Sequence, residues 1–228
     1  MTDLESRSKR LIKQVGPTCA MYAFLNGIIA TKNLDDVDIY QIRKSILDII
    51  EKDNTKHTNI GEFFDIKILK AFLEEYGTEL IKGLGVDYGF NIDLVGKMEY
   101  GYNTFYIVPI FKGMYTTIPI YKYTTMHWIA AVYIDNKLYA VDSPNKIHEL
   151  SSPFMHRMQQ NTELKGKYFT WANWYSNVKT LLRLRFSKFY KSDLIKKRIS
   201  DIKKDNPKAR HYYDVNTNLA LRVKIIEH

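Results

Sequence analysis

The sequence predicts an α+β fold in which helices come first along the chain and strands follow. Up to residue 77, apolar side chains recur mostly at the three- and four-residue spacing of helices. Between residues 103 and 144, runs of β-branched and aromatic residues are separated by turn-forming residues, which is typical of strands. No repeat or low-complexity linker is visible, and 228 residues suit one large domain or one and a half small ones.

The most apolar segment, residues 18–31, is predicted to be a buried helix. The run from Ala20 to Ala30 is apolar on nearly every side of a helix, which is typical of a helix inside a core. Thr18 stands where an N-cap is expected. The predicted helix therefore begins at Cys19, the only cysteine of the chain.

Two further helices are predicted before the strands. Isoleucines at helical spacing indicate one helix over residues 35–52. The next begins within residues 57–77, where Asn59 and Glu62 form a capping-box pattern and Gly77 provides a stop.

Strands are predicted in the middle and at the end of the chain. The segments are a glycine-rich loop over 83–91, a strand over 103–111, a hairpin over 126–144 and a last strand over 219–226. The hairpin is the clearest of these, because two apolar, β-prone runs flank Asp135, Asn136 and Lys137.

Two helices are predicted between the hairpin and the last strand. Residues 170–186 present tryptophan and leucine side chains at helical spacing. Residues 191–207 form a basic amphipathic pattern that ends at Pro207.

The net charge of +9 lies in the last quarter of the chain. Residues 179–228 carry 14 Lys and Arg against 5 Asp and Glu, whereas residues 1–178 carry 20 of each sign. Such a patch can attract nucleic acid, an anionic membrane surface or an acidic protein. A solvated basic helix is the simpler interpretation.

The chain is expected to be soluble and to occupy a reducing compartment. The polar start of the chain, up to Pro17, has no apolar h-region of a signal peptide. No run of about 18 uncharged apolar residues is present, so a membrane-spanning helix is not expected. One cysteine excludes an internal disulfide. We expect a cytoplasmic location, or delivery into another cell without a classical signal peptide.

Cys19 is a candidate nucleophile because of its position at the start of a helix. A thiolate is the reactive form of cysteine, and unpaired N–H groups at a helix N-terminus favour an anion there. A nucleophilic cysteine also needs an imidazole, a group that orients it and an oxyanion donor. Taken alone, Cys19 fits better as a small buried hydrophobe, and its neighbours in the proposed group are what favour a nucleophile.

His127 is the candidate partner among the six histidines. It opens a strand whose next residues, up to Val132, are almost all apolar, so its ring is fixed and can still reach a cleft. His57 lies just before a helix cap and is expected to be solvated. The remaining histidines lie in polar segments, as His148 and His156 do, or in the basic tail, as His211 and His228 do.

Asp142 is the candidate orienting residue, and the hairpin register decides this. A two-residue turn at Asp135 and Asn136 pairs residue 127 with residue 144, which places Asp142 diagonally beside His127 on the same face. A three-residue turn would break this parity and would favour Asn145 instead.

Gln14 is the candidate oxyanion donor. It precedes Cys19 by five residues, and the intervening Gly16 and Pro17 predict a tight turn that folds the Gln14 side chain back towards the cysteine. Its amide could then donate to an oxyanion beside the Cys19 backbone N–H.

Two segments, "QVGPTCAMYAFLNG" and "HWIAAVYIDNKLYAVDSP", resemble papain-like cysteine peptidases, most closely the bacterial C39-like branch. The resemblance covers about 35 residues. It implies a nucleophile in Cys19, a general base and acid in His127, an orienting residue in Asp142 and an oxyanion donor in Gln14. It also implies a papain-like fold, with an N-terminal helical half that carries the nucleophile helix and packs on a C-terminal antiparallel sheet.

The same resemblance assigns residues 1–178 to a papain-like catalytic domain. Residues 179–228 are then a basic extension that packs on the same domain, and residues 151–228 match nothing recognised in the family. The transporter to which leader-trimming members are fused is also missing from this sequence.

Three functions follow from these patterns. The first is a peptidase that cleaves a peptide or isopeptide bond of a protein or peptide substrate through an acyl-enzyme. The second is an acyltransferase, a transglutaminase-like enzyme or a deamidase with the same triad. The third is a non-catalytic binding protein that uses its basic C-terminal segment. The two enzymatic hypotheses need no cofactor and no metal ion.

Overall fold

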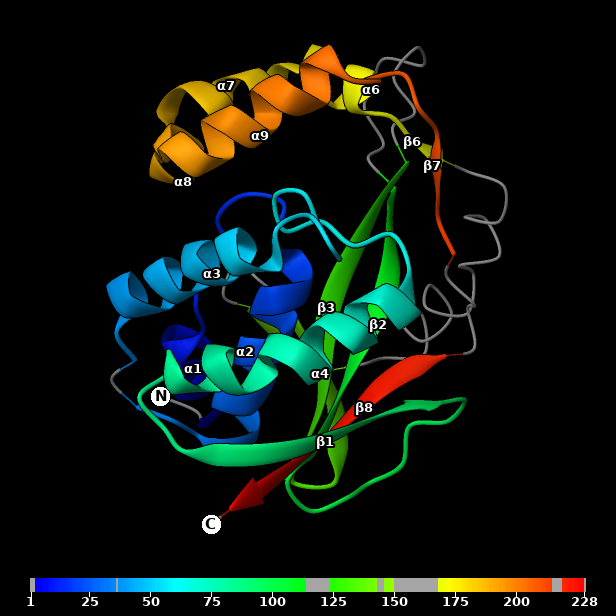
Figure 1. Cartoon of the computed structure of the whole chain (residues 1–228). Coiled ribbons are helices and arrows are strands. Elements are labelled where there is room, and N and C mark those ends of the chain that lie inside the picture. Colours follow the sequence, from blue (N-terminus) through cyan, green and yellow to red (C-terminus); the bar gives the residue numbers. More distant parts are fainter. Residues whose placement is uncertain are drawn as a thin grey trace.

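The computed structural model describes residues 3–35, 37–113, 124–142, 146–149, 168–214 and 219–227. The fold is α+β, with helices packed on an antiparallel sheet (Figure 1). The helices are α1 (Asp3–Arg10), α2 (Cys19–Lys32), α3 (Ile39–Asp53), α4 (Ile66–Lys82), α6 (Trp171–Ser176), α7 (Val178–Phe186), α8 (Lys188–Lys191) and α9 (Asp193–Lys204). The strands are β1 (Tyr88–Val95), β2 (Thr104–Gly113), β3 (Thr124–Ile134), β4 (Lys137–Asp142), β5 (Lys146–Glu149), β6 (Tyr168–Phe169), β7 (His211–Tyr212) and β8 (Ala220–Glu227).

The main sheet has the strand order β1-β8-β2-β3-β4-β5, and every neighbouring pair is antiparallel. The last strand, β8, lies between β1 and β2 (Figure 1). Residues 220–227, from the predicted extension 179–228, are therefore an inner part of the sheet that carries His127. Strands β6 and β7 pair separately as a short ribbon.

Helix α2 is the centre of the core, as its composition predicts. Residues 20–30 are all buried, and the helix contacts β2, β3 and β4. Gly27 permits this approach, because a Cβ there would lie 2.3 Å from the Phe105 ring of β2. The Asn26 side chain accepts a hydrogen bond from the Ile12 N–H at 2.8 Å and donates to the Ile12 carbonyl at 3.0 Å. These bonds fix the segment that leads to Cys19.

The second predicted helix is confirmed as α3, with Asp38 as its N-cap. The prediction of the third helix is wrong at both ends. It begins after Asp65, whose side chain accepts from the Lys67 N–H, and it continues through Gly77 to Lys82. Gly77 is needed for packing rather than for stopping, because a Cβ there would lie 2.4 Å from the Phe90 ring of β1.

The predicted strands over 103–111 and 219–226 are confirmed as β2 and β8, and the hairpin over 126–144 as β3 and β4 through residue 142. The loop predicted over 83–91 is wrong from Tyr88 onwards, where β1 begins. Its partner is β8, so the pairing that forms β1 comes from the far end of the chain.

The C-terminal helices differ from the prediction in one place. Residues 170–186 form two helices, because Asn177 adopts an extended conformation that ends α6 and its side chain accepts from the Thr180 N–H at the start of α7. The predicted basic helix over 191–207 is confirmed as α9. Helices α6 to α9 lie together at the top of Figure 1, and we call residues 171–204 the helical layer.

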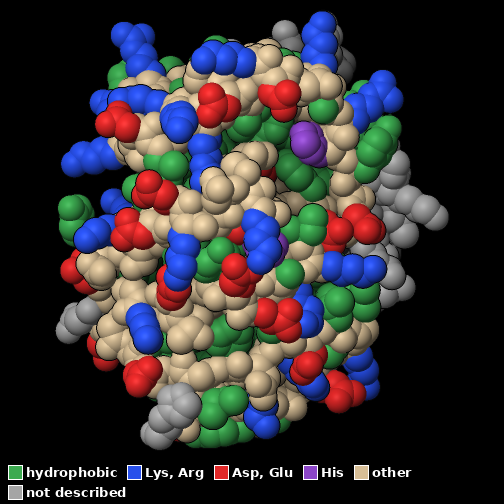
Figure 2. All heavy atoms as spheres, in the orientation of Figure 1, with side chains coloured by type: hydrophobic (Ala, Val, Ile, Leu, Met, Phe, Trp, Pro, Cys, Tyr) green, Lys and Arg blue, Asp and Glu red, His purple; other side chains and the backbone are tan. Residues whose placement is uncertain are grey.

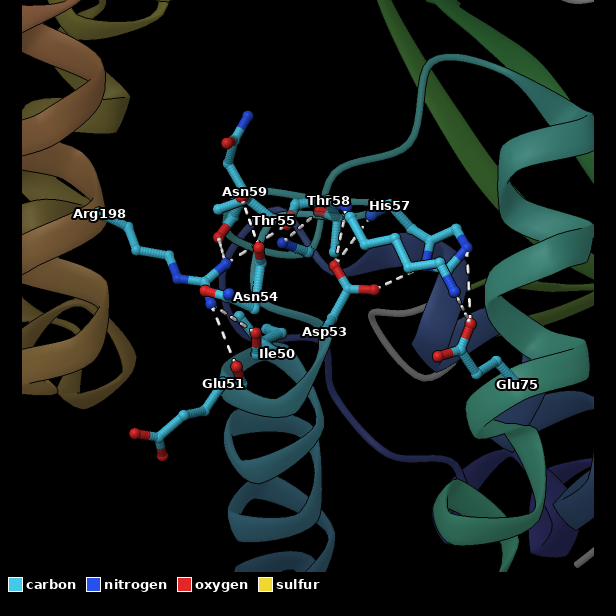
Figure 3. A network of polar contacts seen from close by, with 12 residues as sticks. Ile50, Glu51, Asp53, Asn54, Thr55, His57, Thr58, Asn59, Glu75 and Arg198 are labelled. Carbon is cyan, nitrogen blue, oxygen red and sulfur yellow. Dashed lines mark hydrogen bonds and ion pairs between the residues drawn. The ribbon is translucent and has the colours of Figure 1, made fainter.

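One buried arginine of α9 fastens the helical layer to the rest of the protein. Arg198 donates to the backbone carbonyls of Ile50 at 2.8 Å and Asn59 at 3.0 Å, and more distantly to those of Glu51 and Thr58 (Figure 3). It is only 8% exposed. Because these carbonyls belong to the end of α3 and the following loop, Arg198 joins segments about 140 residues apart.

Within the described ranges, every helix is too short or too polar to cross a lipid bilayer.

Candidate active site

Cys19 is the first residue of α2 and is partly exposed. Thr18 occupies the N-cap position, but its hydroxyl donates to the Val15 carbonyl at 2.5 Å and does not cap the helix. The first backbone N–H groups of α2 are therefore not used by this side chain, and they point towards the Cys19 end of the helix. Such N–H groups favour a negative charge on the thiol sulfur.

The turn before Cys19 depends on a glycine. Gly16 has φ +75°, which glycine adopts without strain, and a Cβ there would lie 2.5 Å from the Phe189 ring of α8. The helical layer therefore packs directly on the turn that positions the cysteine.

His127 and Asp142 come together through the register of the hairpin. Asp135 and Asn136 have φ of 48° and 61°, and Ile134 pairs with Lys137, so the turn has two residues. Imidazole Nε2 of His127 then lies 2.6 Å from Oδ1 of Asp142.

This is the diagonal relation that the two-residue turn predicts. The three-residue turn, which would have favoured Asn145, is not formed, and Asn145 itself lies outside the described residues.

The third member of this group is the thiol of Cys19. Burial lowers the pKa of the His127 imidazole, but the hydrogen bond to Asp142 and the interaction with Cys19 raise it more, to about 9. The imidazole is therefore protonated at neutral pH. Because Nε2 faces Asp142, the other ring nitrogen, Nδ1, is the one suited to exchange a proton with Cys19.

The side chain of Gln14 folds back onto its own turn. Its amide nitrogen donates to the Gly16 carbonyl at 2.8 Å, three residues before Cys19. An amide nitrogen carries two hydrogens, so this bond is compatible with a second one to an oxyanion. The oxyanion role of Gln14 stays a prediction.

Tyr213 is a site residue that the sequence did not indicate. Its hydroxyl accepts a hydrogen bond from the backbone N–H of Met126, next to His127, and it interacts electrostatically with Cys19. Burial raises the pKa of Tyr213 to about 12, so the phenol is neutral. It comes close because the Asp214 N–H donates to the Phe64 carbonyl at 3.1 Å. No local pattern marks it among 17 tyrosines.

The other histidines lie apart from this group or outside the description. His57 was expected to be solvated, which is wrong: its side chain is 9% exposed, and Nδ1 lies 2.6 Å from Oδ1 of Asp53. His211 stacks on Phe64 with ring centroids 5.4 Å apart, and burial lowers its pKa. The side chains of His148, His156 and His228 are not among those described.

In the part of the chain that the structure describes, three or more His, Cys, Asp or Glu side chains do not gather in a way that could hold a metal ion. Comparisons with protein-family models, with curated proteins and with solved structures return no match.

Proposed function

We propose that this protein is a cysteine peptidase-like hydrolase of papain-like fold that cleaves a peptide or isopeptide bond. The proposal is supported by two contacts of the His127 imidazole, one with the Asp142 carboxylate and one with the Cys19 thiol. The thiol also lies at a helix N-terminus. Each group has one defined task in acyl transfer.

The first half of the reaction forms an acyl-enzyme. The Cys19 thiolate bonds to the carbonyl carbon of the substrate, and the carbonyl oxygen takes up the negative charge. That oxyanion is stabilised by the Cys19 backbone N–H and the Gln14 amide. When the tetrahedral intermediate collapses, the C–N bond breaks and the His127 imidazolium gives its proton to the leaving nitrogen.

The second half releases the acyl group. Neutral His127 takes a proton from a water molecule, whose oxygen attacks the thioester carbon. The C–S bond breaks, a carboxylic acid leaves, and the thiolate and imidazolium are restored. Asp142 holds the imidazole in place throughout by accepting from Nε2.

Alkylation of the single cysteine tests the first requirement, a thiolate at acidic pH. Iodoacetamide at pH 6 should label Cys19 about a hundredfold faster than an ordinary thiol, whose pKa is about 8.5. His127→Gln should bring the rate down to that of a free thiol. Slow labelling in both proteins would exclude an imidazole-activated nucleophile.

Product analysis tests the reaction itself. The protein is incubated with a peptide library, with and without glycine methyl ester, and the products are identified by mass spectrometry. Free carboxylates in both incubations support hydrolysis. Products that carry the amine indicate an acyltransferase or a transglutaminase-like enzyme, and conversion of glutamine to glutamate without chain cleavage indicates a deamidase. Cys19→Ala should abolish every one of these products.

A further inference from the structure

Helix α7 exposes large apolar side chains together with arginines. Leu181, Leu182 and Phe186 are 50%, 52% and 67% exposed, and Arg183 and Arg185 stand exposed among them. The Arg185 guanidinium lies over the Phe186 ring, 5.4 Å from its centroid. Apolar and basic side chains thus share one short stretch of surface.

These apolar side chains are not loosely packed core residues. The helical layer has its own buried contacts, in which Thr180, Phe189 and Tyr190 are each less than 9% exposed. Arg198 and the contact of Phe189 with Gly16 hold the layer on the body of the protein. The leucines and Phe186 therefore lie on the side of α7 that the fold does not use.

The charge around α7 has one sign. Residues 180–210 carry 11 Lys and Arg against 3 Asp. Apart from Arg198, all of these cations are exposed: Arg183, Arg185, Lys188, Lys191, Lys196, Lys197, Lys203, Lys204, Lys208 and Arg210. Figure 2 shows Lys and Arg side chains projecting along the top of the molecule, over the helical layer.

We propose that the exposed face of α7, with the basic residues around it, docks the protein on an anionic lipid membrane surface. A bilayer interface accepts both kinds of side chain, because leucine and phenylalanine enter the acyl boundary while arginines and lysines meet anionic headgroups. A nucleic acid would satisfy the cations but would leave the three large apolar side chains without a favourable partner. The observed combination therefore favours lipid.

Docking would act on the site through contacts that already exist. Phe189, in the helix after α7, packs on the Gly16 turn that precedes Cys19. A membrane-bound helical layer would therefore hold the Cys19 end of α2 at a fixed distance from the bilayer. The membrane proposal is independent of the proposed hydrolase activity, since it concerns other residues and a different measurement.

Vesicle co-sedimentation of the full chain tests the proposal. The vesicles are phosphatidylcholine alone or phosphatidylcholine mixed with phosphatidylserine. We expect binding to the mixed vesicles only, decreasing with added salt. The double variant Leu182→Gln with Arg183→Gln should weaken binding to the mixed vesicles about fiftyfold. Loss of one cation should contribute about fivefold, and loss of one inserted leucine about tenfold.

The matched control changes the same kinds of side chain elsewhere. Lys67→Gln with Ile68→Gln removes an exposed cation and an apolar residue that is 43% exposed on α4, and it should leave vesicle binding unchanged. Thermal unfolding of each variant verifies that it folds.

Three outcomes would overturn the proposal. They are equal binding to both vesicle types, no binding to either, and equal loss in the α7 and control variants. A duplex DNA that binds more tightly than the vesicles, and for which Leu182→Gln alone has no effect, would establish a nucleic-acid surface instead.

Discussion

Two histidine–aspartate pairs in this protein have the same length but different surroundings. His127 to Asp142 and His57 to Asp53 both have an N···O distance of 2.6 Å, and both histidine side chains are close to 10% exposed, at 11% and 9%. In the first pair, the imidazole also interacts with the Cys19 thiol. In the second pair, backbone N–H groups and a further carboxylate surround the histidine and the aspartate.

The His57 pair closes the loop that follows α3. The second carboxylate oxygen of Asp53 accepts from the backbone N–H groups of His57 and Thr58 at 3.0 and 3.1 Å (Figure 3). The His57 ring packs edge-on against Phe72 and Tyr76 of α4. Its Nε2 lies 3.9 Å from Glu75, so both sides of the ring meet acidic groups.

The surroundings, and not the length of the imidazole–carboxylate contact, distinguish the two pairs. The His57 pair is local in sequence and is bonded to the backbone around it. The His127 pair joins two strands and adjoins a thiol at the start of a helix. We assign chemistry to the second arrangement because a nucleophile is within its reach.

The largest expected difference between the pairs is in turnover. His127→Gln removes the proton donor and acceptor of the proposed reaction, so kcat/KM for a cleaved peptide should fall about a thousandfold. His57→Gln should change it by less than about twofold, because that ring touches no reacting group. Steady-state kinetics of both variants make the measurement. Equal losses in the two would remove the distinction between the pairs.

A smaller expected effect is the pH dependence of turnover. The pKa of His127 is raised to about 9, so the imidazolium that would protonate the leaving group in the proposed reaction is lost as the pH rises through about 9. Asp142→Asn removes one cause of that rise. We expect the alkaline limb of kcat/KM to move to lower pH, with about a hundredfold loss of kcat/KM at neutral pH.

Asp53→Asn serves as the control for this change. It alters the other carboxylate in the same way, and the alkaline limb should stay where it is in the unaltered protein. A limb that keeps its position in Asp142→Asn would show that this carboxylate does not set the His127 pKa.

The reverse difference is expected in stability. Asp53 is 2% exposed and accepts two backbone N–H groups besides the imidazole, so Asp53→Ala leaves buried donors without an acceptor. Its free energy of unfolding should fall by about 2 kcal/mol. Asp142→Ala should cost less, because that side chain is 22% exposed and water can replace it. Urea denaturation compares the two, and a larger loss in Asp142→Ala would contradict this assignment.

The contact between His127 and Asp142 could be predicted from the sequence because a local feature, the two-residue turn of the hairpin, determines it. A two-residue turn with both central residues at positive φ suits Asp135 and Asn136, and it fixes which residues of the two strands lie together. The buried helix behind Cys19 was accessible for a similar reason, since its composition alone indicates a core position.

The errors arose where distant segments decide the structure. Asn59 and Glu62 do form the predicted bond, with the Asn59 N–H 3.1 Å from Oε1, but they form it in a loop and not at a helix start. His57 looked solvated because its neighbours in sequence are polar, whereas its ring is covered by aromatic side chains of α4. The basic helix over 191–207 had solvation as its simpler interpretation, but its Arg198 is buried, and the carbonyl partners of that side chain lie about 140 residues earlier.

Tyr213 provides the last and smallest test of the comparison, because each histidine pair has a tyrosine nearby. Burial raises the pKa of both Tyr213 and Tyr76 to about 12, so both phenols are neutral donors. Of these two tyrosines, only Tyr213 interacts electrostatically with Cys19, and the dipole of its neutral hydroxyl can stabilise a thiolate there. Tyr213→Phe keeps the ring and removes the hydroxyl, so iodoacetamide labelling at pH 6 should slow about tenfold. Tyr76→Phe should leave the labelling rate unchanged, and an equal rate in both variants would show that the hydroxyl of Tyr213 only positions the backbone at Met126.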